Sequence, residues 1–259
     1  SVLIPDGERS TLCVSTQVGC AQGCSFCATA TLGFQRNLSA SEIVAQAWIA
    51  AGEMASEPDS AREITNIVLM GMGEPLLNVR NSILATNLFK EDLAFGLSKR
   101  RVTISTVGIV PGIKKMTELT DVSLAVSLHA ANNELRSRLI PANRHYPLEM
   151  LIPACRDYIS GKLHRSITWE YVMLEGENDT DKDALELVKL LEGIPSKINL
   201  IPFNTYPGCD FRCPSDERMA RFARLIHNRG ITVTIRRSRG EDIAAACGQL
   251  VGEAAEINN

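Results

Sequence analysis

Three cysteines stand close together near the start of the chain, in the stretch CAQGCSFCATA. Cys20 and Cys24 are followed by Cys27, in the spacing Cys-x3-Cys-x2-Cys. Structural zinc takes four protein ligands in a closed tetrahedron, and this stretch supplies three. A cubane [4Fe–4S] cluster held by three thiolates leaves one iron open to a small molecule. The amino acid end of S-adenosylmethionine offers an amino group and a carboxylate for that position, so the spacing indicates such a cluster.

Other interpretations of the cysteines stay open on the residues alone. The same three thiols with Cys13 as fourth ligand make a zinc site. Cys13 lies in a strand pattern and Cys247 among alanines, where a cysteine is usually a small buried apolar residue. Cys155, in the helical IPACRDYI, is predicted to be a core residue, and Cys209 and Cys213 are predicted to be surface or spare thiols.

Composition indicates the class of protein that surrounds these thiols. The chain has 259 residues, 45% of them hydrophobic, and a net charge of −3. These values predict one domain over residues 1–259. Eight cysteines in this composition favour metal binding or catalysis over a disulfide framework. No apolar run approaches the roughly 20 residues of a membrane span, and no secretory signal opens the chain. We therefore expect a cytoplasmic protein that does not bind membranes.

The elements that must position the thiols follow from the apolar pattern. Short β-branched apolar runs alternate with helical patterns, some of which begin with capping boxes at Ser39 and Glu42 and at Thr180 and Asp183. This order predicts an α/β fold with a parallel sheet and outer helices, in a partial or full (β/α) TIM-like barrel. The predicted strands lie within residues 11–19, 64–75, 100–108, 122–130, 167–174, 197–204 and 231–238.

Polar residues gather where these strands end, and barrel enzymes place their chemistry there. Glu74 follows the second strand in GMGEP, where its carboxylate is suited to accept hydrogen bonds from an ammonium group. The same Gly-Glu-Pro stretch also suits a plain turn from strand to helix. His129 in such a place is usually a structural residue. Further residues at strand ends are Gly71, Gly73, Ser105, Thr106, Ser127, Leu128 and Asn204.

Basic residues are clustered in few places. Lys99–Arg101 form one run, and Arg236, Arg237 and Arg239 form another. Such runs, and Arg36 in GFQRNL, are either solvated surface or local contacts to phosphate. The pattern leaves both interpretations open.

The sequence resembles the bacterial RNA adenine-C2 methyltransferases, which are radical S-adenosylmethionine enzymes. The resemblance covers nearly the whole chain and rests on the cysteine motif with VLMGMGEPLLN, FGLSKRRVTISTVG, SLHAANNELR, KINLIPFN and RGEDIAAACGQL. It implies a partial (β/α)6 radical-SAM barrel with a [4Fe–4S] cluster on Cys20, Cys24 and Cys27. It also implies that S-adenosylmethionine is contacted by Gly73, Glu74, Ser105, Ser127, Leu128, His129 and Asn204. The family carries a small N-terminal RNA-binding domain, which we expect to be absent from these 259 residues, and a catalytic glutamate that should fall just before Ser1.

The resemblance further implies a mechanism with two catalytic cysteines, Cys247 and Cys13. Cys247 takes a methyl group from one S-adenosylmethionine, and a radical from a second molecule converts it to a methylene that adds to adenine C2. Cys13 then attacks the linking sulfur and leaves a disulfide. The expected partners are 23S rRNA, tRNA and flavodoxin- or thioredoxin-like reductants, and we expect a monomer.

Two alternatives to this function remain. One is the related adenine-C8 methyltransferase, although GFQRNL and FGLSKRR look closer to the C2 branch. The other is a zinc-stabilised RNA-binding module without catalysis, which leaves the polar residues at the strand ends unexplained.

Overall fold

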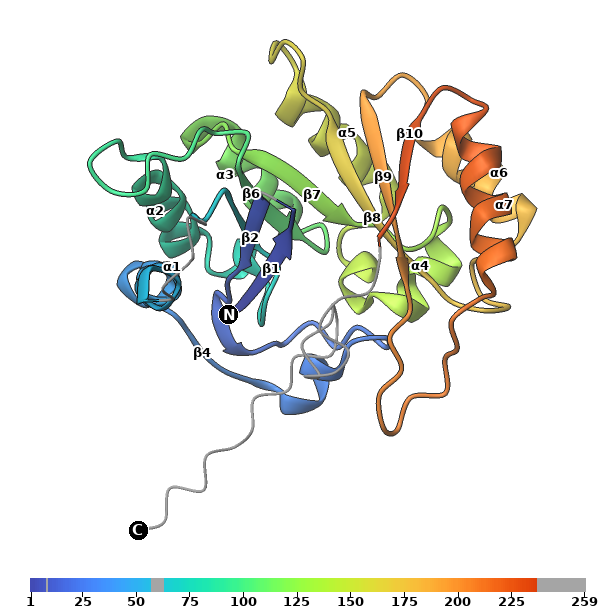
Figure 1. Ribbon diagram of the computed structural model, residues 1–259. Coiled ribbons are helices and arrows are strands. Elements are labelled where there is room, and N and C mark those ends of the chain that lie inside the picture. The colour runs from blue at the N-terminus through green and yellow to red at the C-terminus, as the bar shows by residue number, and fades with distance from the viewer. Residues whose placement is uncertain (8, 57–62, 237–259) are drawn as a thin grey trace.

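A curved sheet forms the centre of the computed structural model, which describes residues 1–7, 9–56 and 63–236 (Figure 1). Within these residues, eight strands pair in the order β1-β2-β5-β6-β7-β8-β9-β10. β1 is antiparallel to β2, and all other neighbours in this sheet are parallel. The strands are β1 (Val2–Asp6), β2 (Arg9–Cys13), β5 (Asn66–Leu69), β6 (Val102–Thr106), β7 (Ser123–Ser127), β8 (Ile167–Met173), β9 (Ser196–Pro202) and β10 (Thr232–Ile235).

Helices cover the outside of the curve. α1 packs against α2 near one end of the sheet, α3 packs against α5, and α6 packs against α7 near the other end (Figure 1). Short 3-10 helices follow the cysteine motif, Glu74 and α4. The helices are α1 (Ala40–Ser56), α2 (Val79–Lys90), α3 (Val110–Leu119), α4 (Asn133–Leu139), α5 (Leu148–Ile159), α6 (Asp181–Leu190) and α7 (Asp216–His227), with 3-10 turns at Ala28–Leu32, Pro75–Leu77 and Pro141–Arg144.

The two faces of the sheet differ in chemistry. Along β6, Val102 and Ile104 are fully buried in the core between sheet and helices, while Thr103 and Ser105 alternate with them on the inner face. On β8, Glu170 is likewise an inner residue between outer core residues. The inner face therefore presents polar side chains, whereas the interior of a closed barrel is usually filled by branched apolar ones. A half-open curve with a polar lining leaves room for a ligand.

The predicted partial barrel is confirmed. Each of the seven predicted apolar runs overlaps one of the strands β2, β5, β6, β7, β8, β9 and β10, and β2 and β9 begin shortly before their runs. Both predicted capping boxes are present: Ser39 and Glu42 exchange side-chain and backbone hydrogen bonds at the start of α1, and Thr180 and Asp183 do so at α6. None of the described helices is long and apolar enough to cross a membrane.

Some elements were not predicted. The first run divides into β2 and a short strand, β3 (Gln17–Gly19), which pairs antiparallel with β4 (Phe34–Asn37) in a separate small sheet. The antiparallel edge strand β1 was also missed. The β3–β4 pair spans the cysteine motif and determines where it lies.

Candidate active site

The three cysteines lie in the connection between β2 and α1, at the carboxyl end of β2. The β3–β4 pair requires glycine at position 19, because a Cβ there would lie 1.8 Å from the carbonyl oxygen of Gly33. The absence of a side chain lets the two strands approach closely. The Cys20 N–H donates to that same carbonyl at 2.9 Å. On the other side of the loop, the Ser25 N–H donates to the carbonyl of Leu139 at 3.1 Å, which attaches the motif to the end of α4.

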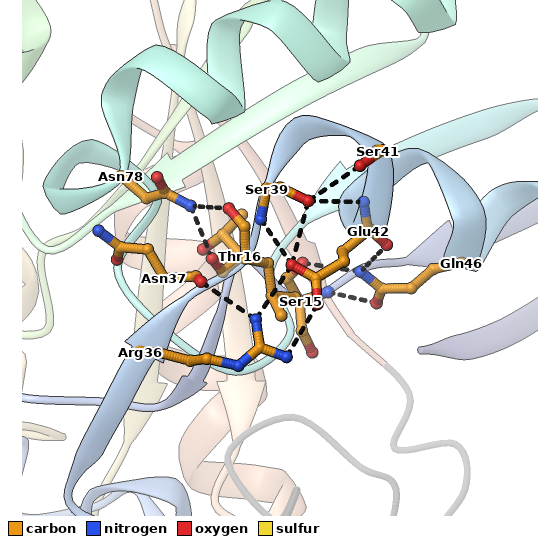
Figure 2. Close-up of polar contacts among 10 residues, drawn as sticks. Ser15, Thr16, Arg36, Asn37, Ser39, Ser41, Glu42, Gln46 and Asn78 are labelled. Atoms are coloured by element: carbon orange, nitrogen blue, oxygen red, sulfur yellow. Dashed lines mark hydrogen bonds and ion pairs between the residues drawn. The ribbon is translucent and has the colours of Figure 1, made fainter.

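Residues before and after the cysteine motif form hydrogen bonds with α1 and with Asn78, which precedes α2 (Figure 2). The Ser15 N–H donates to Gln46 Oε1 at 2.9 Å, and Gln46 Nε2 donates back to the Ser15 carbonyl at 2.9 Å. Asn78 Nδ2 donates to the carbonyls of Thr16 and Leu38, at 2.9 and 2.7 Å. The loop that carries the cysteines is therefore held by side chains of α1 and by the residue that precedes α2.

Arg36 takes part in the same network. Its guanidinium forms an ion pair with Glu42 at 2.8 Å (Figure 2). Hydrogen bonds from Arg36 and Ser39 lower the pKa of Glu42 from 4.5 to about 2. Of the two interpretations left open for Arg36, this pairing of an exposed side chain favours a solvated surface residue over a contact to phosphate. Lys99 in the other basic run is paired similarly, with Asp121 at 2.6 Å.

The three thiols interact with one another electrostatically. Burial raises the pKa of Cys24 strongly and that of Cys20 as well, and the neighbouring thiols raise both further. Burial therefore favours the protonated form of Cys20 and Cys24, whereas metal coordination deprotonates a thiol outright. Among the described residues, no three His, Cys, Asp or Glu side chains converge enough to hold a single metal ion. A cubane cluster spreads its ligands over several irons, so three neighbouring thiols on one fixed loop fit it better than one zinc ion.

A cavity opens beside the loop on the inner face of the sheet. It encloses about 820 Å³ of space, its open mouth included. The structure brings six of the predicted site residues to its wall: Cys27, Gly73, Glu74, Ser105, Ser127 and His129. Leu128 and Asn204 are buried nearby but do not line it. Phe26, Thr106, Glu170, Val172, Phe203 and Arg236 are further lining residues.

Glu74 is the buried carboxylate of this cavity. It caps the turn Pro75–Leu77, with Oε1 accepting from the Leu76 N–H at 2.9 Å. Oε2 accepts from the Val107 N–H at 2.8 Å, so Glu74 joins the ends of β5 and β6. Burial raises its pKa to about 7, although these hydrogen bonds oppose the shift. A cationic ligand in the cavity favours the ionised form of such a carboxylate.

His129 is held in an unusual backbone conformation. Its φ is 59°, and Asn178 Nδ2 donates to its carbonyl at 2.9 Å. Its Nδ1 accepts from the Val172 N–H at 2.9 Å, which assigns the proton of the neutral ring to Nε2. Burial lowers the pKa of the imidazole to about 3. The ring meets Phe26 edge to face, with 4.5 Å between centroids, so His129 connects the cavity wall to the cysteine loop.

Glu170 is a cavity residue that the sequence prediction missed. Its Oε1 accepts from Asn199 Nδ2 at 3.0 Å, and burial raises its pKa. Its buried Oε2 has no hydrogen-bond partner in the described part of the chain. The sequence does contain a signal for this residue: Glu170 is the single carboxylate inside the apolar run ITWEYVML. Because side chains alternate between the two faces of a strand, its position predicts that it points to the inner face.

The predicted catalytic cysteines are only partly covered by the structure. Cys13 ends β2 and is buried, and its neighbours Leu12 and Val14 belong to the outer core. Strand alternation therefore places Cys13 on the inner face, although it does not line the cavity. Cys247 lies outside the described residues. Cys155 is fully buried in α5, which confirms it as a core residue.

The remaining two thiols lie in the connection after β9. Cys209 and Cys213 are half-buried, and both pack against the apolar cluster that contains Cys24. Their position beside the cysteine loop was not predicted, because nothing in the sequence relates residues so far apart.

The curled parallel sheet and the three-cysteine loop at its carboxyl edge define a barrel of the radical-SAM type. A sequence model described as the Radical SAM superfamily matches residues 14–188. The chain is 57% identical to the dual-specificity RNA methyltransferase RlmN of Alkalilimnicola ehrlichii, over 98% of this chain and 69% of the relative. It is 58% identical to the protein of the same name from Halorhodospira halophila, with the same coverage. The chain belongs to the RlmN family of the radical SAM superfamily.

A solved structure agrees with this assignment. The crystal structure of a radical SAM methyltransferase from Sphaerobacter thermophilus has a TM-score of 0.90 to this chain at 48% identity. The match covers 95% of this chain and 72% of that one.

Proposed function

We propose that this chain is a radical S-adenosylmethionine methyltransferase that places a methyl group on C2 of adenosine in 23S rRNA and tRNA. The observation that carries the proposal is the shared cavity of Cys27, Glu74, Ser105 and Ser127, in a chain 57% identical to a protein named as a dual-specificity RNA methyltransferase. A thiol of the three-cysteine motif and a buried carboxylate line the wall of one cavity, as a ligand with an amino acid end requires.

The residues of the loop and the cavity have separate tasks in this proposal. Cys20, Cys24 and Cys27 hold a [4Fe–4S] cluster, and Phe26, edge-on to His129, shields it from water. When bound, such a cluster supplies the electron that cleaves the sulfonium bond of S-adenosylmethionine. Glu74 accepts hydrogen bonds from the amino group of that ligand.

The hydroxyl groups of the inner face bind the rest of the ligand. Ser105 and Ser127 each offer a donor and an acceptor from the ends of β6 and β7. Gly73, His129 and the buried Leu128 and Asn204 complete the proposed binding site.

The carbon that accepts the methyl group explains why two further thiols are needed. Adenine C2 lies between two ring nitrogens and is electron-poor, so it does not attack a methyl sulfonium by itself. Cys247 as thiolate first takes the methyl group from one S-adenosylmethionine and releases S-adenosylhomocysteine. The 5′-deoxyadenosyl radical from a second molecule removes a hydrogen atom from that S-methyl group, and the methylene radical adds to C2, which then gives up one electron and its proton. Cys13 attacks the sulfur of Cys247, which releases the product and leaves a disulfide. A thioredoxin-like reductant resets the pair, and a flavodoxin-like one supplies electrons to the cluster.

The setting of the enzyme is also a proposal. Residues 1–259 form one catalytic domain, which works as a monomer in the cytoplasm. In support, Cys20, Cys24, Cys27, Cys155 and Cys209 are free thiols, as expected in a reducing compartment.

Mass spectrometry of the RNA product tests this function. The iron-loaded protein is incubated with reductant, S-adenosylmethionine carrying a deuterated methyl group, and unmodified 23S rRNA or tRNA. The RNA is then digested to nucleosides and compared with standards. We expect labelled 2-methyladenosine. Labelled 8-methyladenosine would show the alternative regiochemistry, and label on neither carbon would contradict the proposal.

A further inference from the structure

A fully buried arginine lies under the cysteine loop. Arg136 belongs to α4, and its side chain points back to the carboxyl end of β7. Its Nε donates to the carbonyl of Leu128 at 3.1 Å, and its Nη2 donates to the carbonyl of Ser127 at 3.0 Å. Nη2 also donates to the carbonyl of Val107 at 2.7 Å, just after β6. Arg136 thus joins two adjacent strand ends that carry proposed ligand contacts.

All the hydrogen-bond acceptors found for this guanidinium are neutral. The fourth one is Oδ1 of Asn143, which accepts from Nη1 at 2.6 Å. Asn143 in turn donates to Asn133, and Asn133 donates to the exposed carboxylate of Glu149, so two amides stand between Arg136 and that charge. In the described part of the chain, Arg136 forms no ion pair with a carboxylate. Arginine is almost never fully buried unless it is paired, because burial of an uncompensated charge is costly.

The cysteine loop packs against the helix of Arg136 and would carry negative charge as cluster-bound thiolates. Cys24 packs in one apolar cluster with Leu135 and Leu139, which flank Arg136 on α4. The Ser25 N–H donates to the Leu139 carbonyl, so the loop rests directly on this helix. Arg136 and Cys24 interact electrostatically. The thiol of Cys155 is also close, but burial raises its pKa to about 12 and keeps it neutral.

We infer that Arg136 is a positioning residue that supplies a fixed positive charge to the cluster bound at Cys24 and stabilises its reduced state. This inference rests on the proposed function, because it requires that the loop hold a cluster. A positive charge near a redox centre favours the form with one more electron, so it raises the reduction potential. The hydrogen bonds to the carbonyls of Ser127 and Leu128 keep this charge in place.

The reduction potential of the anaerobically reconstituted protein tests the inference. It is measured by redox titration followed by electron paramagnetic resonance. Arg136→Gln removes the charge, and we expect a potential more negative than that of the wild type. Arg138→Gln is the matched control, because Arg138 lies on the same helix but is exposed and paired with Glu177 at 2.7 Å. It should keep the wild-type potential. A wild-type potential in Arg136→Gln would overturn the inference.

Two further variants separate the charge from the hydrogen bonds. Arg136→Lys keeps the charge but loses the planar guanidinium, so its melting temperature should fall while its potential stays near the wild-type value. If the reduction potential of Arg136→Lys shifts as far as that of Arg136→Gln, the inference that the positive charge sets the potential is contradicted. Asn143→Asp gives the guanidinium a carboxylate partner and preserves the side-chain shape. It loses the hydrogen bonds that Nδ2 donates to Asn133 and Ser137 but keeps the contact with the guanidinium, and it should show a more negative potential even if Arg136→Gln does not fold. An unchanged potential there would overturn the inference.

Thermal unfolding of the iron-free and iron-loaded forms gives an independent readout. If Arg136 compensates the cluster, loading should raise the melting temperature more in the wild type than in Arg136→Gln. An equal gain in both would show that the arginine only organises the backbone. If the wild-type protein takes up no iron, the proposed function fails. If it loads normally and Arg136→Gln and Asn143→Asp keep its potential, only the role of Arg136 fails.

Discussion

Replacement of Gly73 by alanine should destabilise the protein strongly and loosen Glu74. Gly73 has a φ of 98°, a conformation that side-chain-bearing residues rarely adopt. A Cβ at this position would lie 2.5 Å from the Cβ of Gln17. Gln17 cannot easily move away, because its Oε1 accepts from the Glu74 N–H at 2.9 Å and its Nε2 donates to Asn37 at 2.8 Å.

The expected magnitude follows from two terms. Backbone strain at a positive φ costs about 1–3 kcal/mol. Insertion of a methyl group into a packed contact adds about 1–3 kcal/mol. The free energy of unfolding of Gly73→Ala should therefore fall by about 2–5 kcal/mol, since the site relaxes in part. The displacement of Gln17 should also weaken S-adenosylmethionine binding, because it frees the backbone of Glu74.

Urea denaturation of the iron-free protein measures this loss, with two matched controls. Gly176→Ala has a φ of 71° but no atom within 4 Å of the added Cβ, so it reports the backbone term alone. Gly52→Ala lies in α1 with open space around it and should stabilise the helix by about 0.5–1 kcal/mol. If Gly73→Ala loses no more stability than Gly176→Ala, the close packing of Gly73 on Gln17 is refuted.

Three further outcomes are expected from the polar network. Ser39→Ala removes the cap of α1 and should lower the free energy of unfolding by about 1 kcal/mol in urea denaturation, whereas Ser39→Asp should retain most of it. The pKa of Glu42 is lowered to about 2, mainly by Arg36, so its stabilising effect is complete above about pH 4.5 and is lost as the pH falls toward 2. Glu42→Gln should flatten the decline of stability over that range, and an unchanged slope would count against the ion pair. Asn178→Ala removes the donor to the carbonyls of His129 and Val172 and the acceptor for the Leu174 N–H. The free energy of unfolding should therefore fall by about 2–4 kcal/mol in the same denaturation assay. A loss below 0.5 kcal/mol, on the order of an ordinary surface substitution, would show that Asn178 does not hold this turn.

The parallel sheet was predictable because its signal is local. Continuous apolar runs such as residues 167–174 specify strands buried on the outer face, and capping residues such as Ser39 specify where helices begin. The cysteine loop was predictable for the same reason, since all three thiols lie within one short stretch. The positions of Glu74 and Ser105 in one cavity follow from the rule that strand ends of a parallel sheet lie along one edge.

Other parts of the site were not predictable because they depend on contacts between distant residues. Spacing does not reveal that Arg136 reaches the carbonyl of Val107 or that the Leu139 carbonyl accepts from Ser25. The β3–β4 pair escaped prediction because β4 is exposed along its whole length and has no apolar alternation. Glu170 was hidden in an apolar run: the strand period indicates that its side chain lies on the inner face, but the cavity that it lines is formed by distant segments.

The central claim is that Cys20, Cys24 and Cys27 hold a cluster that cleaves S-adenosylmethionine. Its most direct test is the measurement of iron content together with 5′-deoxyadenosine formation in anaerobically prepared protein under reducing conditions. The wild type should be brown and form 5′-deoxyadenosine. Alanine at any of the three positions should abolish both properties, while Cys213→Ala should keep them. Cleavage retained in any of the three variants, or a colourless wild-type protein with one zinc ion per chain, would contradict the account.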